Sequence, residues 1–333
     1  MISEQLSNKF RICSFLATIF VVYRHSFVIQ AFYGSDLCSS QILIFLTRWI
    51  ANLTEVAVPL FFIMSGFFFL DRMYNTCFLY KNMIAKKAKT LFLPFVFWNL
   101  IGLLILTVSK QETIPQDDLS LIRNFFISDY YGPLWYVRDI MIFMLLVPLY
   151  QWMFDTKFRI VLGLLMIALL IYWMPVDCTV LSSEGLLFFT LGGVLGKNRV
   201  LEYRLKSKWH NVAILFIWQV CCLFVSFWGN EWLHKFFYVI GLPAMWYGID
   251  LLSMKVLGLI KKLSAYTFFV YVTHFYSIKI AKLSIAHFFH GNEIVAIITF
   301  LFVPLLVVAC LFEIGKSINY YFPKFYALTT GNR

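Results

Sequence analysis

Residues 10–32 read FRICSFLATIFVVYRHSFVIQAF, a nearly unbroken apolar stretch that carries Arg24 and His25 deep inside it. About 20 apolar residues are enough for a helix to cross the hydrocarbon core of a bilayer. An ionisable side chain in that core costs about 2.5–3.5 kcal/mol even on the mildest scale, so it is kept for a reason. At about 100° per residue, Ser14 falls on nearly the same helix face as His25 and Arg11 lies about 40° away. One stripe of this helix is therefore polar, and Arg24 and His25 are the first candidates for a functional site.

The composition places the whole chain in the same class as this stretch. Of its 333 residues 61% are hydrophobic, 20% aromatic and only 14% charged, and the mean hydropathy is +0.78. A water-soluble domain does not have this balance. The sequence therefore predicts an all-α, polytopic integral membrane protein.

Apolar runs of spanning length recur along the chain. They predict one membrane-embedded domain over residues 1–333, in which about ten transmembrane helices form a single bundle. The stretch 41–51 is moderately apolar and is the place where this count is most easily wrong. The ten expected helices are 10–32, 54–71, 89–109, 133–154, 158–175, 180–196, 210–229, 235–254, 263–282 and 293–314.

In a soluble protein a net charge of +11 would suggest a nucleic-acid partner. The placement of the basic residues decides between that interpretation and one in which they set the membrane topology. With a cytoplasmic N-terminus, 20 of the 28 lysines and arginines fall in cytoplasmic segments and 6 in outer ones. This asymmetry follows the positive-inside rule. We expect a multi-pass protein of the plasma (inner) membrane with both termini in the cytoplasm, a lipid bilayer as its surroundings and no nucleic acid as partner.

The seven cysteines are scattered without the spacing of metal ligands, so no metal site is expected. Most are interpreted as small apolar side chains. Cys38 and Cys178 both fall on the predicted outer side, where a disulfide between them is an open alternative.

In this topology, ionisable residues from several helices fall at one depth, the outer half of the membrane. Arg138 and Asp139 follow Trp135 within the first two turns of the helix 133–154 and must face protein or water. We expect a water-accessible cavity, open to the outer face, that these residues share. The alternative is a set of structural pairs that stabilise helix contacts, with Trp135 as an interface anchor. The residues concerned are Arg24, His25, Glu55, Trp135, Arg138, Asp139, Glu184 and His274.

Five segments, in this order, carry a resemblance to a known family: VPLFFIMSGFFF, LFLPFVFW, PLWYVRDIMIFMLL, LLFFTLGGVLG and LSAYTFFVYVTH. The chain from about 8 to 314 resembles the integral-membrane acyltransferase-3 family, whose members O-acylate extracytoplasmic glycans and other carbohydrates. The first helix of that family carries an Arg and, after ten intervening residues, a His. His25 matches the His, whereas Ser14 stands at the Arg position. Arg24 and Arg11 are the two candidates for the missing cation.

Acyl transfer from a thioester to a sugar hydroxyl needs a base and a group that stabilises the oxyanion. His25 suits the first role, since histidine has an unperturbed pKa of about 6.5, and Arg24 suits the second. The resemblance implies acyl-CoA as a cytoplasmic co-substrate, with acetyl-CoA as the expected donor, and no cofactor bound permanently. We expect the donor phosphates near basic residues and the pantetheine chain near small ones. The residues so assigned are Arg11, Ser65, Gly66, Lys86, Lys87 and Lys89.

Two other classes of function stay open at this point. Ten helices around a polar cavity also describe a transporter or flippase for a glycan or a lipid-linked sugar. A carrier would need no thioester, so dependence on acyl-CoA separates it from an acyltransferase. The third reading is a catalytically inert partner in assembly of cell-envelope polysaccharide, in which cavity substitutions would be tolerated.

Overall fold

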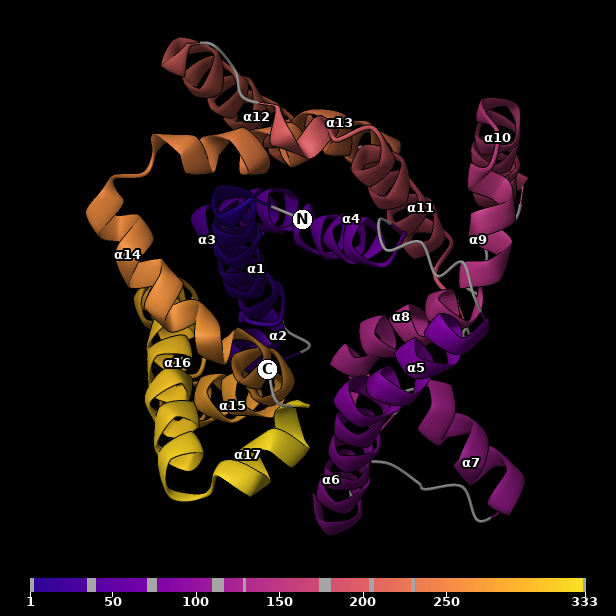
Figure 1. Ribbon diagram of the computed structural model, residues 1–333. Helices are drawn as coiled ribbons and strands as arrows, with labels where there is room; N and C mark the ends of the chain where they lie inside the picture. Colours follow the sequence, from indigo (N-terminus) through magenta and orange to yellow (C-terminus); the bar gives the residue numbers. More distant parts are fainter. Residues whose placement is uncertain are drawn as a thin grey trace. The chain divides into compact units, whose positions relative to one another are not determined.

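The computed structural model of the chain describes residues 3–34, 40–70, 77–109, 117–127, 130–173, 181–203, 207–228 and 231–331 (Figure 1). Within these ranges all regular elements are helices. The all-α prediction is confirmed for the part of the chain described.

The helices come in the following order along the chain. The first half contains α1 (Glu4–Arg24), α2 (Ile29–Tyr33), α3 (Gln41–Thr54), α4 (Ala57–Leu70), α5 (Cys77–Lys87), the π-helix η1 (Ala88–Phe92), α6 (Leu93–Ser109), α7 (Asp118–Ile127), η2 (Gly132–Leu134), α8 (Trp135–Leu145), α9 (Val147–Phe154) and α10 (Lys157–Trp173). The second half contains α11 (Ser183–Lys197), η3 (Val200–Glu202), α12 (Lys208–Trp228), α13 (Glu231–Gly248), η4 (Ile249–Leu251), α14 (Met254–Leu263), η5 (Ser264–Tyr266), α15 (Thr267–Phe288), α16 (Glu293–Tyr321) and α17 (Pro323–Thr330).

By length and hydropathy, six helical segments among the described residues are able to cross a membrane, or seven if the bent pair α8–α9 counts as one span. The chain is thus a multi-pass membrane protein, but the count of ten is not confirmed. Each of the ten predicted segments overlaps at least one helix among the described residues. Two of them, α10 and α11, have 17 and 15 residues, fewer than the roughly 20 that a bilayer core asks for. The six spans are Glu4–Tyr33, Gln41–Phe69, Leu79–Ser109, Lys208–Trp228, Met254–Phe288 and Glu293–Tyr321.

Three predicted boundaries differ from the structure in ways that have a local cause. The helix expected over 10–32 is broken after Arg24, and α2 resumes only at Ile29. The moderately apolar stretch 41–51, which is not among the ten expected helices, belongs to the helix α3, which leads into α4 after a short turn. The basic stretch 77–92 is also helical, because a π-turn just before Pro94 accommodates the missing N–H of the proline without ending the helix.

A fourth difference concerns the helix expected over 133–154. It is split into α8 and α9, which meet at an angle of 60°. Pro148 lies in the first turn of α9, where a proline is tolerated because its N–H would have no partner. The bend follows from that position.

The described residues form two compact units. Unit 1 comprises residues 1–61 and 202–316, and unit 2 comprises residues 62–201 and 317–333, so that the boundary falls inside α4 and inside α16. The prediction of a single bundle over 1–333 is not tested by this division and stays a prediction.

In unit 1, an apolar cluster holds the short helix α2 in place. Phe32 and Val28 are almost fully buried among residues of α3, α15 and α16, and the amide of Gly291 donates to the carbonyl of Phe32 over 2.8 Å. Burial of one large apolar side chain contributes roughly 1.5–3 kcal/mol. The segment after the break in the first helix is therefore anchored. The buried members of the cluster are Val28, Phe32, Tyr33, Leu43, Ile50, Ala286, Ala296 and Phe300.

In unit 2, two glycines bring α4 and α11 into close contact. A Cβ added to Gly66 would lie 1.9 Å from the carbonyl oxygen of Phe189, and one added to Gly192 would lie 2.1 Å from the carbonyl oxygen of Ile63. Only a residue without a side chain permits these main-chain distances, as in small-xxx-small contacts of membrane helices. Gly66 and Gly192 therefore serve the packing of these two helices.

Candidate active site

His25 stands where the first helix of the chain breaks. It caps the C-terminal end of α1, and its amide donates to the carbonyls of Val21 and Val22. The hydroxyl of Ser26 donates to the carbonyl of Tyr23 over 2.7 Å, which offers the backbone an alternative to the helical hydrogen bond. The break thus follows from the polar sequence Arg24-His25-Ser26 itself.

Lys282 of α15 supplies the hydrogen bonds that the broken helix lacks. Its Nζ donates to the carbonyl of His25 over 3.1 Å and to that of Phe27 over 2.9 Å. The end of a helix also carries partial negative charge, which favours a cation there. The lysine therefore holds the segment that carries His25.

His274, also of α15, lies beside His25. The ring centroids are 5.2 Å apart, and the ring of Phe275 lies 5.3 Å from that of His25 on an edge-to-face angle of 85°. His274 is fully buried. Its Nδ1 is 2.6 Å from the carbonyl oxygen of Tyr271; a carbonyl only accepts, so this nitrogen carries the hydrogen and Nε2 is the acceptor. That Nε2 is buried and has no hydrogen-bond partner in the described structure.

Arg24 is exposed and makes only loose contacts. Its guanidinium donates to the carbonyl of Ala51 over 3.4 Å and lies 5.8 Å from the centroid of the Phe27 ring. Adjacency to His25 in the sequence therefore does not bring the guanidinium onto the His25 carbonyl, which Lys282 occupies instead.

The positions on α1 that precede His25 lie far from it. Ser14, eleven residues earlier, is about 16 Å down the helix and Arg11 about 21 Å, at about 1.5 Å per residue. Arg11 is exposed. Neither side chain reaches His25 from these distances, so the polar stripe does not form one contact site.

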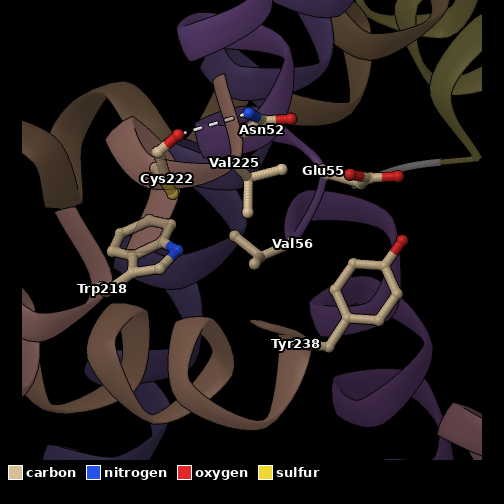
Figure 2. Close-up of a pocket in the computed structure, with 7 residues that line it drawn as sticks. All are labelled: Asn52, Glu55, Val56, Trp218, Cys222, Val225 and Tyr238. Carbon is tan, nitrogen blue, oxygen red and sulfur yellow. Dashed lines mark hydrogen bonds between the residues drawn. The ribbon is translucent and has the colours of Figure 1, made fainter. Parts of the chain in front are cut away.

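Glu55 lies in the turn between α3 and α4 and lines a small pocket of unit 1 (Figure 2). The space open to the centre of a water molecule is about 10 Å³, enough for roughly one water. The amide nitrogen of Asn52 donates to Ser226 Oγ over 2.9 Å beside it. This pocket has polar and apolar walls and is too small for a sugar ring. The lining residues are Asn52, Glu55, Val56, Trp218, Cys222, Val225 and Tyr238.

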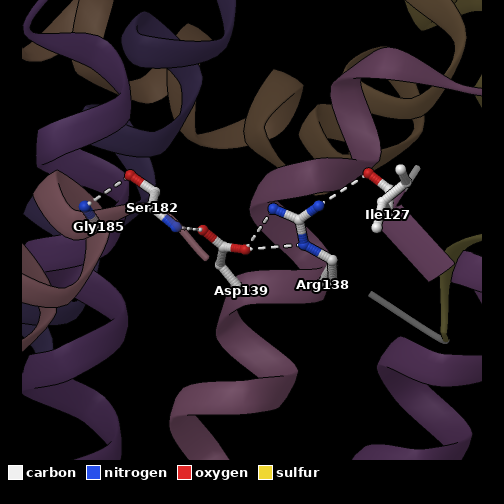
Figure 3. A network of polar contacts seen from close by, with 5 residues as sticks. All are labelled: Ile127, Arg138, Asp139, Ser182 and Gly185. Carbon is white, nitrogen blue, oxygen red and sulfur yellow. Dashed lines mark hydrogen bonds and ion pairs between the residues drawn. The ribbon is translucent and has the colours of Figure 1, made fainter. Parts of the chain in front are cut away.

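Arg138 and Asp139 form a buried ion pair in unit 2 (Figure 3). Arg138 Nε and Nη2 donate to Asp139 Oδ1 over 2.9 and 2.8 Å, and Nη1 donates to the carbonyl of Ile127 over 2.8 Å. The other carboxylate oxygen accepts from the amide of Ser182 over 2.9 Å, and the Ser182 hydroxyl caps α11 by accepting from Gly185 N. The pair thus ties the start of α8 to the end of α7 and the start of α11.

Trp135 and Glu184, two further residues of the predicted cavity, lie at the starts of α8 and α11 in unit 2. Trp135 opens α8, as predicted, and its ring lies 6.0 Å from that of Phe62. Glu184 lies in the first turn of α11, where a carboxylate interacts favourably with the helix dipole. Trp135 therefore packs within unit 2 and Glu184 lies at the start of α11, and the role of both in a cavity stays a prediction.

The residues predicted to hold the acyl donor also lie in unit 2, apart from Arg11. Ser65 Oγ is 2.8 Å from the hydroxyl of Tyr136, and the space beside Gly66 is filled by the main chain of Phe189. Lys86 and Lys89 are exposed, and Lys87 Nζ lies 4.6 Å from the centroid of the Phe69 ring. Gly66 thus serves helix packing, whereas exposed lysines next to the π-turn are compatible with an anionic ligand.

The structure brings together His25 and His274, with Arg24 next to them in unit 1. It brings together Arg138 and Asp139 in unit 2. One cavity shared by both groups stays a prediction, and Cys38 and Cys178 lie outside the described residues.

Lys282 is the residue at this site that sequence reasoning missed. In the predicted topology Lys282 is the last residue of the helix 263–282 and one of the six outer basic residues. The signal was its spacing: seven residues after Phe275 and eight after His274, about two helical turns along nearly the same face of α15.

Comparison with known proteins bears on the chemistry of this site. A sequence profile described as an acyltransferase domain matches residues 14–314. Searches among curated proteins and among solved structures gave no match. The matched region includes both histidines and Lys282 and extends over most of the chain. The chain therefore belongs to the acyltransferase-3 family and is an acyltransferase.

Proposed function

We propose that this acyltransferase moves an acyl group from cytoplasmic acyl-CoA to a hydroxyl of an extracytoplasmic glycan or lipid-linked sugar. The expected acyl group is acetyl. The observation that carries the proposal is His25 at a helix break, with the buried imidazole of His274 5.2 Å away. Family membership supports acyl transfer, and the apolar helices support a reaction at the membrane.

The reaction needs one base and one proton path. His25 takes the proton of the acceptor hydroxyl as the oxygen attacks the thioester carbonyl, and a C–O bond forms. The tetrahedral oxyanion then collapses, the C–S bond breaks, and the CoA thiolate leaves with the proton that His25 returns. General base catalysis of this kind contributes about 10²- to 10⁴-fold to the rate.

His274 supports His25 in this scheme through its fixed tautomer. Because Nδ1 donates to the Tyr271 carbonyl, Nε2 presents a lone pair in a buried place. A rotation of the neutral His25 ring would let its single N–H donate to that lone pair, which would leave the other His25 nitrogen free to accept a proton. The second histidine would thus act as a positioning residue.

Acyl-CoA is a co-substrate and not a resident cofactor in this proposal. The exposed Lys86 and Lys89 are suited to the phosphates of CoA, and so is Arg11 if it lies at the cytoplasmic end of α1. These assignments depend on both termini being cytoplasmic in the plasma (inner) membrane. A reporter fused after residue 333 should then report cytoplasm and one inserted near residue 116 the outer side; the reverse at both sites would refute the scheme.

The test of the function is purified protein in liposomes with radiolabelled acetyl-CoA and a panel of cell-envelope glycans. Transfer of label to a glycan that disappears with His25→Ala is the expected result. A transporter would move the glycan with no thioester present, and an inert partner would show neither activity. Mass spectrometry of surface glycans from cells with and without the chain would identify the acyl group by its mass.

A further inference from the structure

Ser14 stands at the position where the resembling family has an Arg, so a cation for the reaction has to come from another part of the fold. A thioester carbonyl develops negative charge on oxygen when a hydroxyl attacks it, and a donor held in place for that oxygen contributes about 10²- to 10³-fold. The charge has to lie next to the base. Arg11 is about 21 Å from His25 along the helix, and exposed Arg24 makes only a 3.4 Å contact to the carbonyl of Ala51.

Lys282 meets the requirement of position. Its Nζ lies 3.1 Å from the carbonyl oxygen of His25 itself and 2.9 Å from that of Phe27. It reaches this place from α15, the helix that also carries His274 and Phe275, whose rings flank His25. One helix therefore supplies the neighbours of the base and a cation beside it.

Lys282 also meets the requirement of hydrogen-bonding capacity. An ammonium has three donors and no acceptor, and the two carbonyls use two of them. Within the residues that the structure describes, Lys282 bonds to no carboxylate. A positive charge and one N–H are thus left for a ligand.

We propose that Lys282 is the cation of the reacting centre: it holds the helix break that carries His25, and its third N–H stabilises the thioester oxyanion. The inference rests on the acyl transfer proposed above. The lysine stays protonated throughout, because the proton of the acceptor hydroxyl passes to His25 and from there to the CoA thiolate. In this chain a cation from α15 thus serves where sequence reasoning looked for one on the first helix.

The experiment has to separate the charge of Lys282 from its support of the helix break. Lys282→Gln retains two N–H donors on a side chain one bond shorter, but removes the charge. Lys282→Arg retains both charge and donors. Lys279→Gln, one turn away on α15, removes the same charge and serves as the control. Steady-state kcat and KM for acetyl-CoA and acceptor would be measured in liposomes, with the melting temperature of each variant as the measure of folding.

We expect Lys282→Gln to lower kcat on the order of 100-fold with both KM values within about twofold, and Lys282→Arg to retain at least about a tenth of the wild-type kcat. Lys279→Gln should stay within about threefold. A Lys282→Gln protein with near-normal kcat would overturn the inference. So would an equally inactive Lys282→Arg protein with the melting temperature of the wild type, because charge would then not be the property that matters.

Should Lys282→Gln fail to fold, Lys282→Cys provides a second route. Alkylation with 2-bromoethylamine rebuilds an ammonium of lysine length, whereas iodoacetamide leaves a neutral side chain; wild type treated in parallel controls for the other cysteines. Activity restored by the first reagent only supports the proposal, and activity restored by both or by neither refutes it. If wild type transfers no acyl group at all, it is the proposed function that fails, not the placement of the charge.

Discussion

Two pairs of adjacent ionisable residues lie in apolar helices of this chain, and they differ in burial and in hydrogen-bond partners. Arg138 and Asp139 are buried and satisfy each other, with Ile127 and Ser182 as further partners. Arg24 and His25 stand at a helix break. Among the residues that the structure describes, Lys282 bonds there to two main-chain carbonyls, and Nε2 of His274 has no hydrogen-bond partner. Groups that already have their partners hold helices together, and groups with unused hydrogen-bonding capacity are available for a substrate.

The comparison makes His25→Ala the substitution with the largest expected effect on activity. Removal of the base should lower acyl transfer by about 100-fold or more, while membrane insertion and the melting temperature stay near those of the wild type, because His25 is only half-buried. Transfer in liposomes and protease accessibility of the inserted protein measure the two properties. A correctly inserted variant with near-normal transfer would remove His25 from the chemistry.

For the other pair we expect the reverse pattern, a loss of stability without a specific loss of turnover. Asp139→Asn leaves the buried Arg138 charge uncompensated, which costs about 3–5 kcal/mol. The melting temperature in detergent should fall sharply, and activity per folded molecule should stay close to normal. The double variant Arg138→Met, Asp139→Leu should recover part of the stability. An Asp139→Asn protein that is stable but inactive would move this pair into the reacting centre.

A glycine substitution tests whether unit 2 also uses its small residues for packing. Gly66→Ala places a Cβ 1.9 Å from the carbonyl oxygen of Phe189, so α4 and α11 must separate, at a cost of about 1–3 kcal/mol. Gly258→Ala in α14, where a Cβ meets nothing within 4 Å, is the matched control. The melting temperature should fall only for Gly66→Ala. An unchanged melting temperature with a raised KM for acetyl-CoA would instead support donor binding at Gly66.

Arg24→Gln is expected to have the smallest effect. Its guanidinium is exposed and makes one long hydrogen bond, and charges in such positions contribute at most about 1 kcal/mol. We expect kcat to fall by no more than about fivefold, with KM for acetyl-CoA unchanged. Arg48→Gln, an exposed arginine of α3, is the control. A fall of 100-fold would make Arg24, rather than Lys282, the cation of the site.

Much of this protein is determined by the sequence alone. The membrane class, the helical character of the predicted segments where they are described, and Trp135 at the start of α8 follow from apolar runs, because these signals are local and the hydrophobic driving force is strong. His25 was found for the same reason, since an ionisable residue in an apolar run is costly wherever the helix goes. The family was indicated by the resemblance of five short motifs. The count of ten spans is not confirmed: among the described residues, six helical segments, or seven with the bent pair α8–α9, are long and apolar enough to cross a membrane.

The tertiary structure determines which partners the ionisable side chains have. His25 and Lys282 are separated by 257 positions, and no local signal links a lysine on α15 to the carbonyls of a break in the first helix. The sequence places both Arg138-Asp139 and Arg24-His25 in apolar stretches, where burial of charge is costly, but it does not show which side chains of other helices lie against them. What distinguishes them is the set of partners that the fold brings within hydrogen-bonding distance. Those partners come from other helices, and packing alone selects them.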